Sequence, residues 1–178
     1  EDILMVDQSD WGEFWVQVAE GRFDKDYFDD LIHAVPTDPE DIQNYLKCRS
    51  KDTWDTDEHI DIVPLWLCLQ AGSFGGKHIW SGINKQGLCC FKNASFRNYW
   101  KPTATSSRRS PVNPMMPMPT TLQKQVHNVV DCMSPIKALC ASVEDIDWVV
   151  YENNIRTKDR VVVFIDPPYE NTTGYGFN

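Results

Sequence analysis

The chain has 178 residues, of which 42% are hydrophobic and 12% aromatic, and this suits one domain with room for an insertion. No apolar run approaches the ~20 residues needed to cross a bilayer, and the acidic stretch EDILMVDQSD lacks the basic region of a secretory signal. The formal net charge of −9 would argue against a nucleic-acid partner if the charge were spread evenly along the chain.

Periodicity and capping signals predict the first elements in chain order: a buried strand over 3–6 that ends at Asp7, helices over 11–21, 26–35 and from Pro39 onward, and an apolar helix over 59–72. Ser9 or Asp10 suits the N-cap of the first helix. Pro39 suits the first position of its helix, where a missing N–H costs nothing.

Helical periodicity fades between Ser73 and about Thr120 and then returns. The predicted elements are short strands in KHIWSG and GLCCFKN, a proline-rich extended loop in SSRRSPVNPMMPMPTT, a helix in LQKQVHNVVDCM, a strand over 136–142, a helix in VEDIDWVVYEN and a strand over 161–165.

Apolar strands separated by helices indicate an α/β fold with a parallel sheet. Ligands of such sheets bind beyond the carboxyl ends of the strands. Asp7 and Asp166 directly follow two of the predicted strands, and Glu144 and Asp145 lie shortly after a third. We therefore expect acidic side chains along that edge.

The charge is divided unevenly along the chain. Residues 1–61 hold 18 acids and 5 bases, residues 62–130 hold 8 bases and no acid, and residues 131–178 hold 8 acids and 4 bases. Bases mixed with aromatic and amide side chains suit contact with phosphates and nucleobases, although a solvated loop without acids remains the alternative. The candidate DNA-binding residues are Lys77, Lys85, Lys92, Arg97, Lys101, Arg108 and Arg109.

The six cysteines and four histidines show no metal-ligand spacing, so no metal site is expected. Adjacent Cys89 and Cys90 suit neither a simple disulfide pair nor a zinc knuckle. Reduced, buried thiols in a cytoplasmic protein are the simpler interpretation.

The stretch RVVVFIDPPYENTTGYG raises the question of why an apolar strand ends in an acid, two prolines and a tyrosine. Two prolines fix the backbone and stop further strand pairing. The carboxylate of Asp166 and the carbonyl of Pro167 can then direct two acceptors at one point, and Tyr169 can stack beside it. Two acceptors and a ring suit the exocyclic amine of a base that has been flipped out of its duplex.

The DPPY motif formed by Asp166, Pro167, Pro168 and Tyr169 resembles the catalytic motif of S-adenosylmethionine-dependent amino-methyltransferases. Its aspartate form is most similar to the Dam-like adenine-N6 DNA methyltransferases. The resemblance implies a Rossmann-like methyltransferase sheet with a DNA-recognition insertion. It also implies that double-stranded DNA is the partner, in the cytoplasm of a bacterial or phage-infected cell.

The same resemblance assigns Asp7 to the cofactor ribose and Asp145, with Glu144 as the alternative, to the cofactor adenine. The segment LCLQAGSFGGKHIWSGINKQG resembles a degraded form of the family's F-N-G-x-x-R-x-N segment. Residues 1–61 would then form the second strand and helices of the core, 62–130 the target-recognition insertion, and 131–178 the core strands with the catalytic motif.

The family's glycine-rich F-x-G-x-G loop precedes the ribose acid, and it is not found between Glu1 and Asp7. We expect the chain to be the middle of such an enzyme. It would then be either the product of a truncated reading frame or half of a split enzyme whose missing strands come from a second chain. Two alternatives stay open: an amino-methyltransferase that acts on cytosine-N4 or on RNA, and a non-catalytic nucleic-acid-binding module.

Overall fold

The structure is a computed structural model that describes residues 3–36, 38–56, 61–73, 77–96, 116–132 and 136–145. The elements in these ranges are β1 (Ile3–Asp7), α1 (Asp10–Ala19), α2 (Lys25–Ala34), α3 (Pro39–Arg49), β2 (Trp54–Asp55), α4 (Ile62–Ala71), β3 (Trp80–Ile83), β4 (Leu88–Lys92), α5 (Pro119–Cys132), β5 (Ile136–Cys140) and the 3-10 helix η2 (Val143–Asp145). The strand predicted over 161–165 lies outside the described residues.

Side-chain caps start three of the helices. Ser9 caps α1 by accepting a hydrogen bond from the N–H of Trp11, as the sequence predicts. Asp24 and Asp61 cap α2 and α4 in the same way. The helix α3 begins at Pro39, which confirms that prediction too. These boundaries depend on neighbouring residues and are therefore visible in the sequence.

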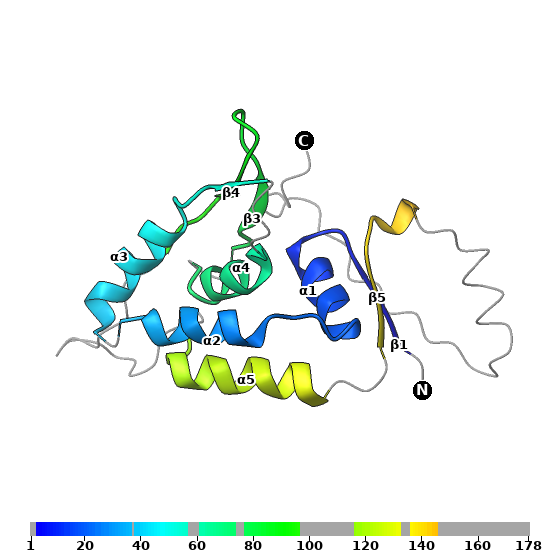
Figure 1. Ribbon diagram of the computed structural model, residues 1–178, viewed down its shortest axis with the longest axis horizontal. Helices are drawn as coiled ribbons and strands as arrows, with labels where there is room; N and C mark the ends of the chain where they lie inside the picture. The colour runs from blue at the N-terminus through cyan, green and yellow to red at the C-terminus, as the bar shows by residue number, and fades with distance from the viewer. Residues whose placement is uncertain are drawn as a thin grey trace, which may run out of the picture.

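The helix α4 is the centre of the core. Every residue from Val63 to Leu69 is buried, and a helix that is apolar on all sides must be enclosed by other elements. Figure 1 shows α4 with α1, α2 and α3 around it and with the antiparallel strands above it. The largest fully buried side chain is that of Trp66, and the ring of Trp11 from α1 meets it edge-on at 4.9 Å.

The strands β1 and β5 pair in parallel, in a register that joins Ile3 to Ile136 and Asp7 to Cys140. This confirms the predicted parallel arrangement, although the sequence did not indicate that these two strands, whose paired residues Ile3 and Ile136 are 133 positions apart, are neighbours. Figure 1 shows the pair at one end of the molecule, beside α1. The described fold is thus mixed α/β, with a small parallel sheet and a small antiparallel one.

The antiparallel sheet has the strand order β2-β4-β3 and includes both short strands predicted from KHIWSG and GLCCFKN. A tight turn over 84–87 joins β3 to β4. The Asn84 side chain accepts the N–H groups of Gln86 and Leu88, and Gly87 takes a φ of 82° that favours glycine. In Figure 1 this hairpin projects from the top of the molecule.

One cluster of buried side chains joins the acidic and basic stretches of the chain. It contains Phe28, Ile32 and Leu46 from residues 1–61, together with Trp66 and Ile79 from residues 62–130. The charge boundary at residue 61 therefore does not separate two cores. Of the helix predicted in VEDIDWVVYEN, the described part is the single turn η2. Among the described helices none is long and apolar enough to span a membrane.

Candidate functional site

The carboxyl ends of β1 and β5 meet at one edge, which we call the strand-end edge. It comprises Asp7, the turn into α1, Cys140 and the residues up to Asp145. Because the strands are parallel, their last residues are neighbours. The N–H of Ala141 donates to the carbonyl of Asp7 at 3.2 Å, so the pairing continues one residue beyond β5.

The turn from β1 into α1 is held tightly. The carboxylate of Asp7 accepts the N–H of Ser9 at 2.7 Å, and the thiol of Cys140 donates to the carbonyl of Ser9 at 3.6 Å. A Cβ atom on Gly12 would lie 1.9 Å from the carbonyl oxygen of Asp7. Only glycine lets the first turn of α1 approach the end of β1 this closely.

The cofactor candidates Asp7 and Asp145 both lie at the strand-end edge, and both are exposed. Asp7 uses Oδ1 for Ser9, and within the described ranges its Oδ2 makes no hydrogen bond. Asp145 ends η2, where its N–H donates to the carbonyl of Ser142. The edge therefore offers carboxylate oxygens to a ligand that carries hydroxyl or amino donors.

The electrostatic character of the strand-end edge is negative. Partial burial of its sulfur raises the pKa of Cys140, and the nearby carboxylates of Glu13, Asp7 and Asp10 raise the pKa further. Such an environment keeps Cys140 a neutral thiol. It also favours a ligand that is neutral or positively charged over one that carries phosphate.

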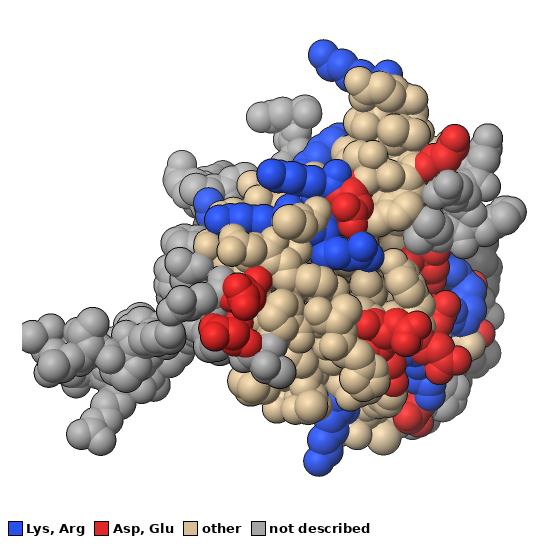
Figure 2. Space-filling model, turned by 60° about the vertical axis from the view of Figure 1, so that its left-hand side comes forward, with Lys and Arg blue, Asp and Glu red and all other residues tan. Residues whose placement is uncertain are grey.

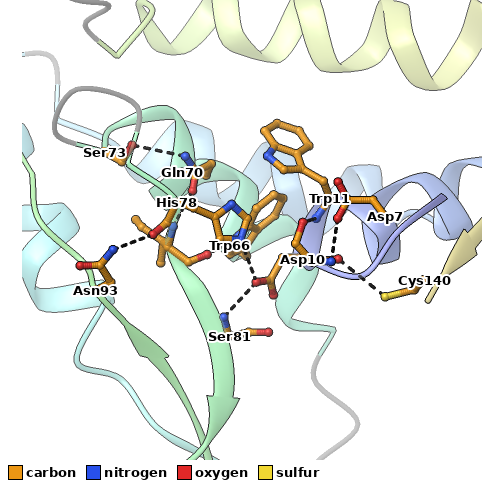
Figure 3. A network of polar contacts seen from close by, with 12 residues as sticks. Asp7, Asp10, Trp11, Trp66, Gln70, Ser73, His78, Ser81, Asn93 and Cys140 are labelled. Atoms are coloured by element: carbon orange, nitrogen blue, oxygen red, sulfur yellow. Dashed lines mark hydrogen bonds and ion pairs between the residues drawn. The ribbon is translucent and has the colours of Figure 1, made fainter. Parts of the chain in front are cut away.

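Asp10, which the sequence indicates only as a possible helix cap, connects the strand-end edge to the antiparallel sheet. Its Oδ2 accepts the N–H of Ser81 at 3.0 Å and lies 3.6 Å from Nε2 of His78. The Asp10 side chain is only 9% exposed. Figure 3 shows it between the start of α1 and the strand that carries Ser81. Its contacts lie about 70 residues along the chain, so no local pattern reveals them.

The backbone before β3 is fixed from two sides. The indole N–H of Trp66 donates to the carbonyl of Ile79 at 2.6 Å, and the Gln70 side chain accepts the N–H of Ile79 and donates to the carbonyl of Lys77. Asn93, which directly follows β4, donates to the carbonyl of His78 (Figure 3). The ring of His78 lies between those of Trp66 and Trp80, with centroids 5.8 and 4.0 Å away. The hydrogen bonds from Trp66 and Gln70 to residues 77–79 therefore fix the orientation of the antiparallel sheet relative to α4.

Three of the candidate DNA-binding residues lie on or next to the antiparallel sheet. Lys77 precedes β3, Lys85 lies in the hairpin turn and Lys92 ends β4, and all three are exposed. Arg97, Lys101, Arg108 and Arg109 lie outside the described residues. So do the four residues of the DPPY motif, Asp166, Pro167, Pro168 and Tyr169.

Among the described residues no group of three or more His, Cys, Asp or Glu side chains could hold a metal ion. In comparisons with known proteins, no family model, no curated protein and no solved structure matches the chain.

Proposed function

We propose that the chain forms part of an S-adenosylmethionine-dependent DNA methyltransferase that modifies the N6 amino group of adenine. The observation that carries the proposal is the parallel pairing of β1 with β5, since it brings Asp7 and the turn at 143–145 to one edge. The DPPY sequence follows an apolar run of the type that joins such a sheet. In the proposal the two described strands belong to a larger Rossmann-like sheet.

The hydrogen-bond acceptors of the strand-end edge suit the proposed cofactor. When bound, S-adenosylmethionine supplies a methyl group on a positively charged sulfonium, which is a good leaving group. Oδ2 of Asp7, which makes no hydrogen bond to the described residues, suits the ribose hydroxyls, and the exposed carboxylate of Asp145 suits the amino group of the cofactor adenine. Negative potential at this edge favours a sulfonium compound over a nucleotide that carries phosphates.

The target base is held by the DPPY motif. Asp166 and the carbonyl of Pro167 accept hydrogen bonds from the adenine amino group, and Tyr169 stacks on the flipped ring. The lone pair of this amino group is normally delocalised into the ring, and two acceptors favour the pyramidal form in which it is available. Pro168 keeps the corner rigid. No strong base is needed, because the amine proton leaves after transfer.

The first experiment measures radiolabelled methyl transfer to duplex DNA and then maps the modified base. We expect N6-methyladenine from the wild-type protein and no transfer from Asp166→Ala, with DNA binding largely retained. Equal loss of transfer and binding would give Asp166 a structural role. Modification of cytosine-N4, or of RNA alone, would replace the adenine-DNA assignment. Salt-dependent DNA binding without any transfer would leave the non-catalytic module as the explanation.

Cofactor binding is tested separately by calorimetry. We expect Asp7→Asn to weaken S-adenosylmethionine binding about tenfold or more, because a charge-assisted hydrogen bond is replaced by a neutral one. The matched control is Asp30→Asn, at an exposed position on α2. An equal loss in both variants, or in neither, would remove Asp7 from the cofactor site.

The role of the proline-rich basic stretch is tested with the double variant Arg108→Ala and Arg109→Ala. We expect weaker DNA binding and a shallower dependence of the binding constant on salt, because two phosphate contacts are lost. A salt dependence equal to that of the wild type would exclude both arginines from the interface.

A further inference from the structure

Basic residues from the acidic part of the chain lie next to the antiparallel sheet. Residues 47–55 and 77–92 together hold six bases and two acids, so their net charge is +4 in a chain of −9. Three of these bases, Lys47, Arg49 and Lys51, come from residues 1–61. Residues 1–61 also hold 18 acids, so a count of charge along the sequence does not show these three bases as a basic group. The fold brings them close to lysines from the basic stretch.

The register of the antiparallel sheet brings the end of α3 toward Lys92. Trp54 pairs with Cys89 and Asp55 with Leu88, so the chain enters β2 from the end of β4 that carries Lys92. Lys51 lies three residues before Trp54, and Lys92 lies three residues after Cys89. Lys77 also approaches this end of the sheet, because Trp80, three residues later, pairs with Lys92.

Lys47 and Lys51 lie on one side of the chain. The N–H of Ser50 donates to the carbonyl of Leu46 and that of Lys51 to the carbonyl of Cys48, so the helical path of α3 continues through residue 51. Residues four apart on such a path are neighbours. Both lysines are exposed.

The other charges in these two ranges leave the lysines dominant. Arg49 is paired with Asp52 at 2.9 Å, so this arginine and this acid largely neutralise each other. Asp55 is the remaining acid of the two ranges, and it makes interactions of its own. The lysines Lys47, Lys51, Lys77, Lys85 and Lys92 form what we call the basic sheet surface. In Figure 2, Lys and Arg side chains gather below the projecting hairpin, and the larger groups of acids lie lower on that face.

We propose that Lys47 and Lys51 extend the lysines of the antiparallel sheet into one surface that contacts the phosphates of duplex DNA. The inference rests on the proposed function, which makes DNA the partner. From Lys92 to the hairpin turn the sheet runs on the order of 14 Å, at about 3.4 Å per residue. Lys51, Lys77 and Lys92 approach one end of this length and Lys85 lies at the other, so the surface spans about four phosphate spacings of a strand, which carries a phosphate every ~3.4 Å along the helix axis.

The test is a double variant, Lys47→Ala with Lys51→Ala, titrated with a fluorescein-labelled 20-base-pair duplex at several salt concentrations. Each phosphate contact contributes about 0.9 to the slope of log Kobs against log salt, so we expect the slope to become shallower by about 1.8. At 0.1 M salt the loss of one such contact lowers the binding constant for DNA about eightfold, and the loss of both lowers it about 60-fold. The control variant is Lys124→Ala with Lys137→Ala, two exposed lysines on α5 and β5, away from the hairpin. Its slope should stay within about 0.5 of the wild type.

The outcomes separate this surface from the proposed catalytic function. A shallower slope in the α3 variant alone supports the surface, even if the wild-type protein transfers no methyl group. An unchanged slope overturns it, even if Asp166→Ala abolishes transfer. Unlabelled competitors test the partner. If polyglutamate or single-stranded RNA displaces the labelled duplex as well as unlabelled duplex does, duplex DNA is not the partner.

Discussion

The substitution Gly12→Ala tests whether the turn between β1 and α1 is as tight as its geometry indicates. At an exposed helix position, replacing glycine by alanine stabilises the folded protein by about 1 kcal/mol, so helix propensity alone predicts that Gly12→Ala raises the free energy of unfolding. Here the new Cβ would lie 1.9 Å from the carbonyl oxygen and 2.8 Å from the carbonyl carbon of Asp7, and 3.2 Å from Cα of Cys140. All three are backbone atoms, so no flexible side chain can give way. Relieving such an overlap costs about 1–3 kcal/mol or more, and α1 would have to move away from β1 and β5.

Because a 1.9 Å contact with a backbone oxygen is severe, we take the upper end of this range, about 3 kcal/mol, and subtract the propensity gain of about 1 kcal/mol. We therefore expect Gly12→Ala to lower the free energy of unfolding by about 2 kcal/mol or more. Urea denaturation followed by circular dichroism measures this change. Asn44→Ala, at an exposed position of α3, is the control and should be neutral or stabilising by up to about 0.7 kcal/mol. A Gly12→Ala protein as stable as the wild type, or more stable, would refute the close approach of α1 to β1.

Three further expectations concern stability and reactivity. Trp66→Phe should lower the free energy of unfolding, measured by urea denaturation, by roughly 2–4 kcal/mol, because it leaves the buried carbonyl of Ile79 without its donor and opens a cavity. A decrease of less than about 0.5 kcal/mol would contradict this. Burial raises the pKa of the Cys68 thiol to about 12, so it should react with a disulfide reagent at pH 8 only after denaturation, whereas exposed Cys48 should react in the folded protein; rapid labelling of Cys68 would argue against its burial. The hydrogen bond from Lys25 lowers the pKa of Asp131, so its contribution to stability is present above about pH 4 and is lost as the pH falls through the lower pKa of the folded state. The urea midpoint of Asp131→Asn should therefore lie below that of the wild type near neutral pH and approach it once the pH has fallen below the lowered pKa of Asp131, and a gap that persists in strong acid would contradict the pairing.

Local signals account for the elements that could be predicted from the sequence. Ser9 and Pro39 start their helices by interactions within a few residues, and the apolar run over 3–6 forms the predicted strand. The projecting hairpin follows from Asn84 and Gly87, whose turn chemistry is equally local. Such features survive in almost any fold that the chain could adopt.

The assembly of the candidate site depends on contacts that no window of sequence contains. Asp10 meets Ser81 across 71 residues, and Cys140 meets Ser9 across 131. The charge division at residue 61 identified the basic stretch but left out Lys47 and Lys51. Charge counted along the chain does not record which segments the β2–β4 pairing brings together.

By itself, the sequence determined the type and order of most described helices and strands, which residues are apolar enough to be buried, and that an acid ends the first strand. These properties depend on side-chain chemistry and on hydrogen bonds between near neighbours. It did not predict β2, and it placed the starts of α4 and α5 three residues away from where the structure has them. The tertiary structure decided that β5 is the partner of β1, that Asp7 and Asp145 share an edge, and that the segment after α3 enters the antiparallel sheet at the end of β4 that carries Lys92. The physical reason is that burial of the apolar faces around α4 selects among many possible long-range pairings, and that selection depends on the whole chain at once.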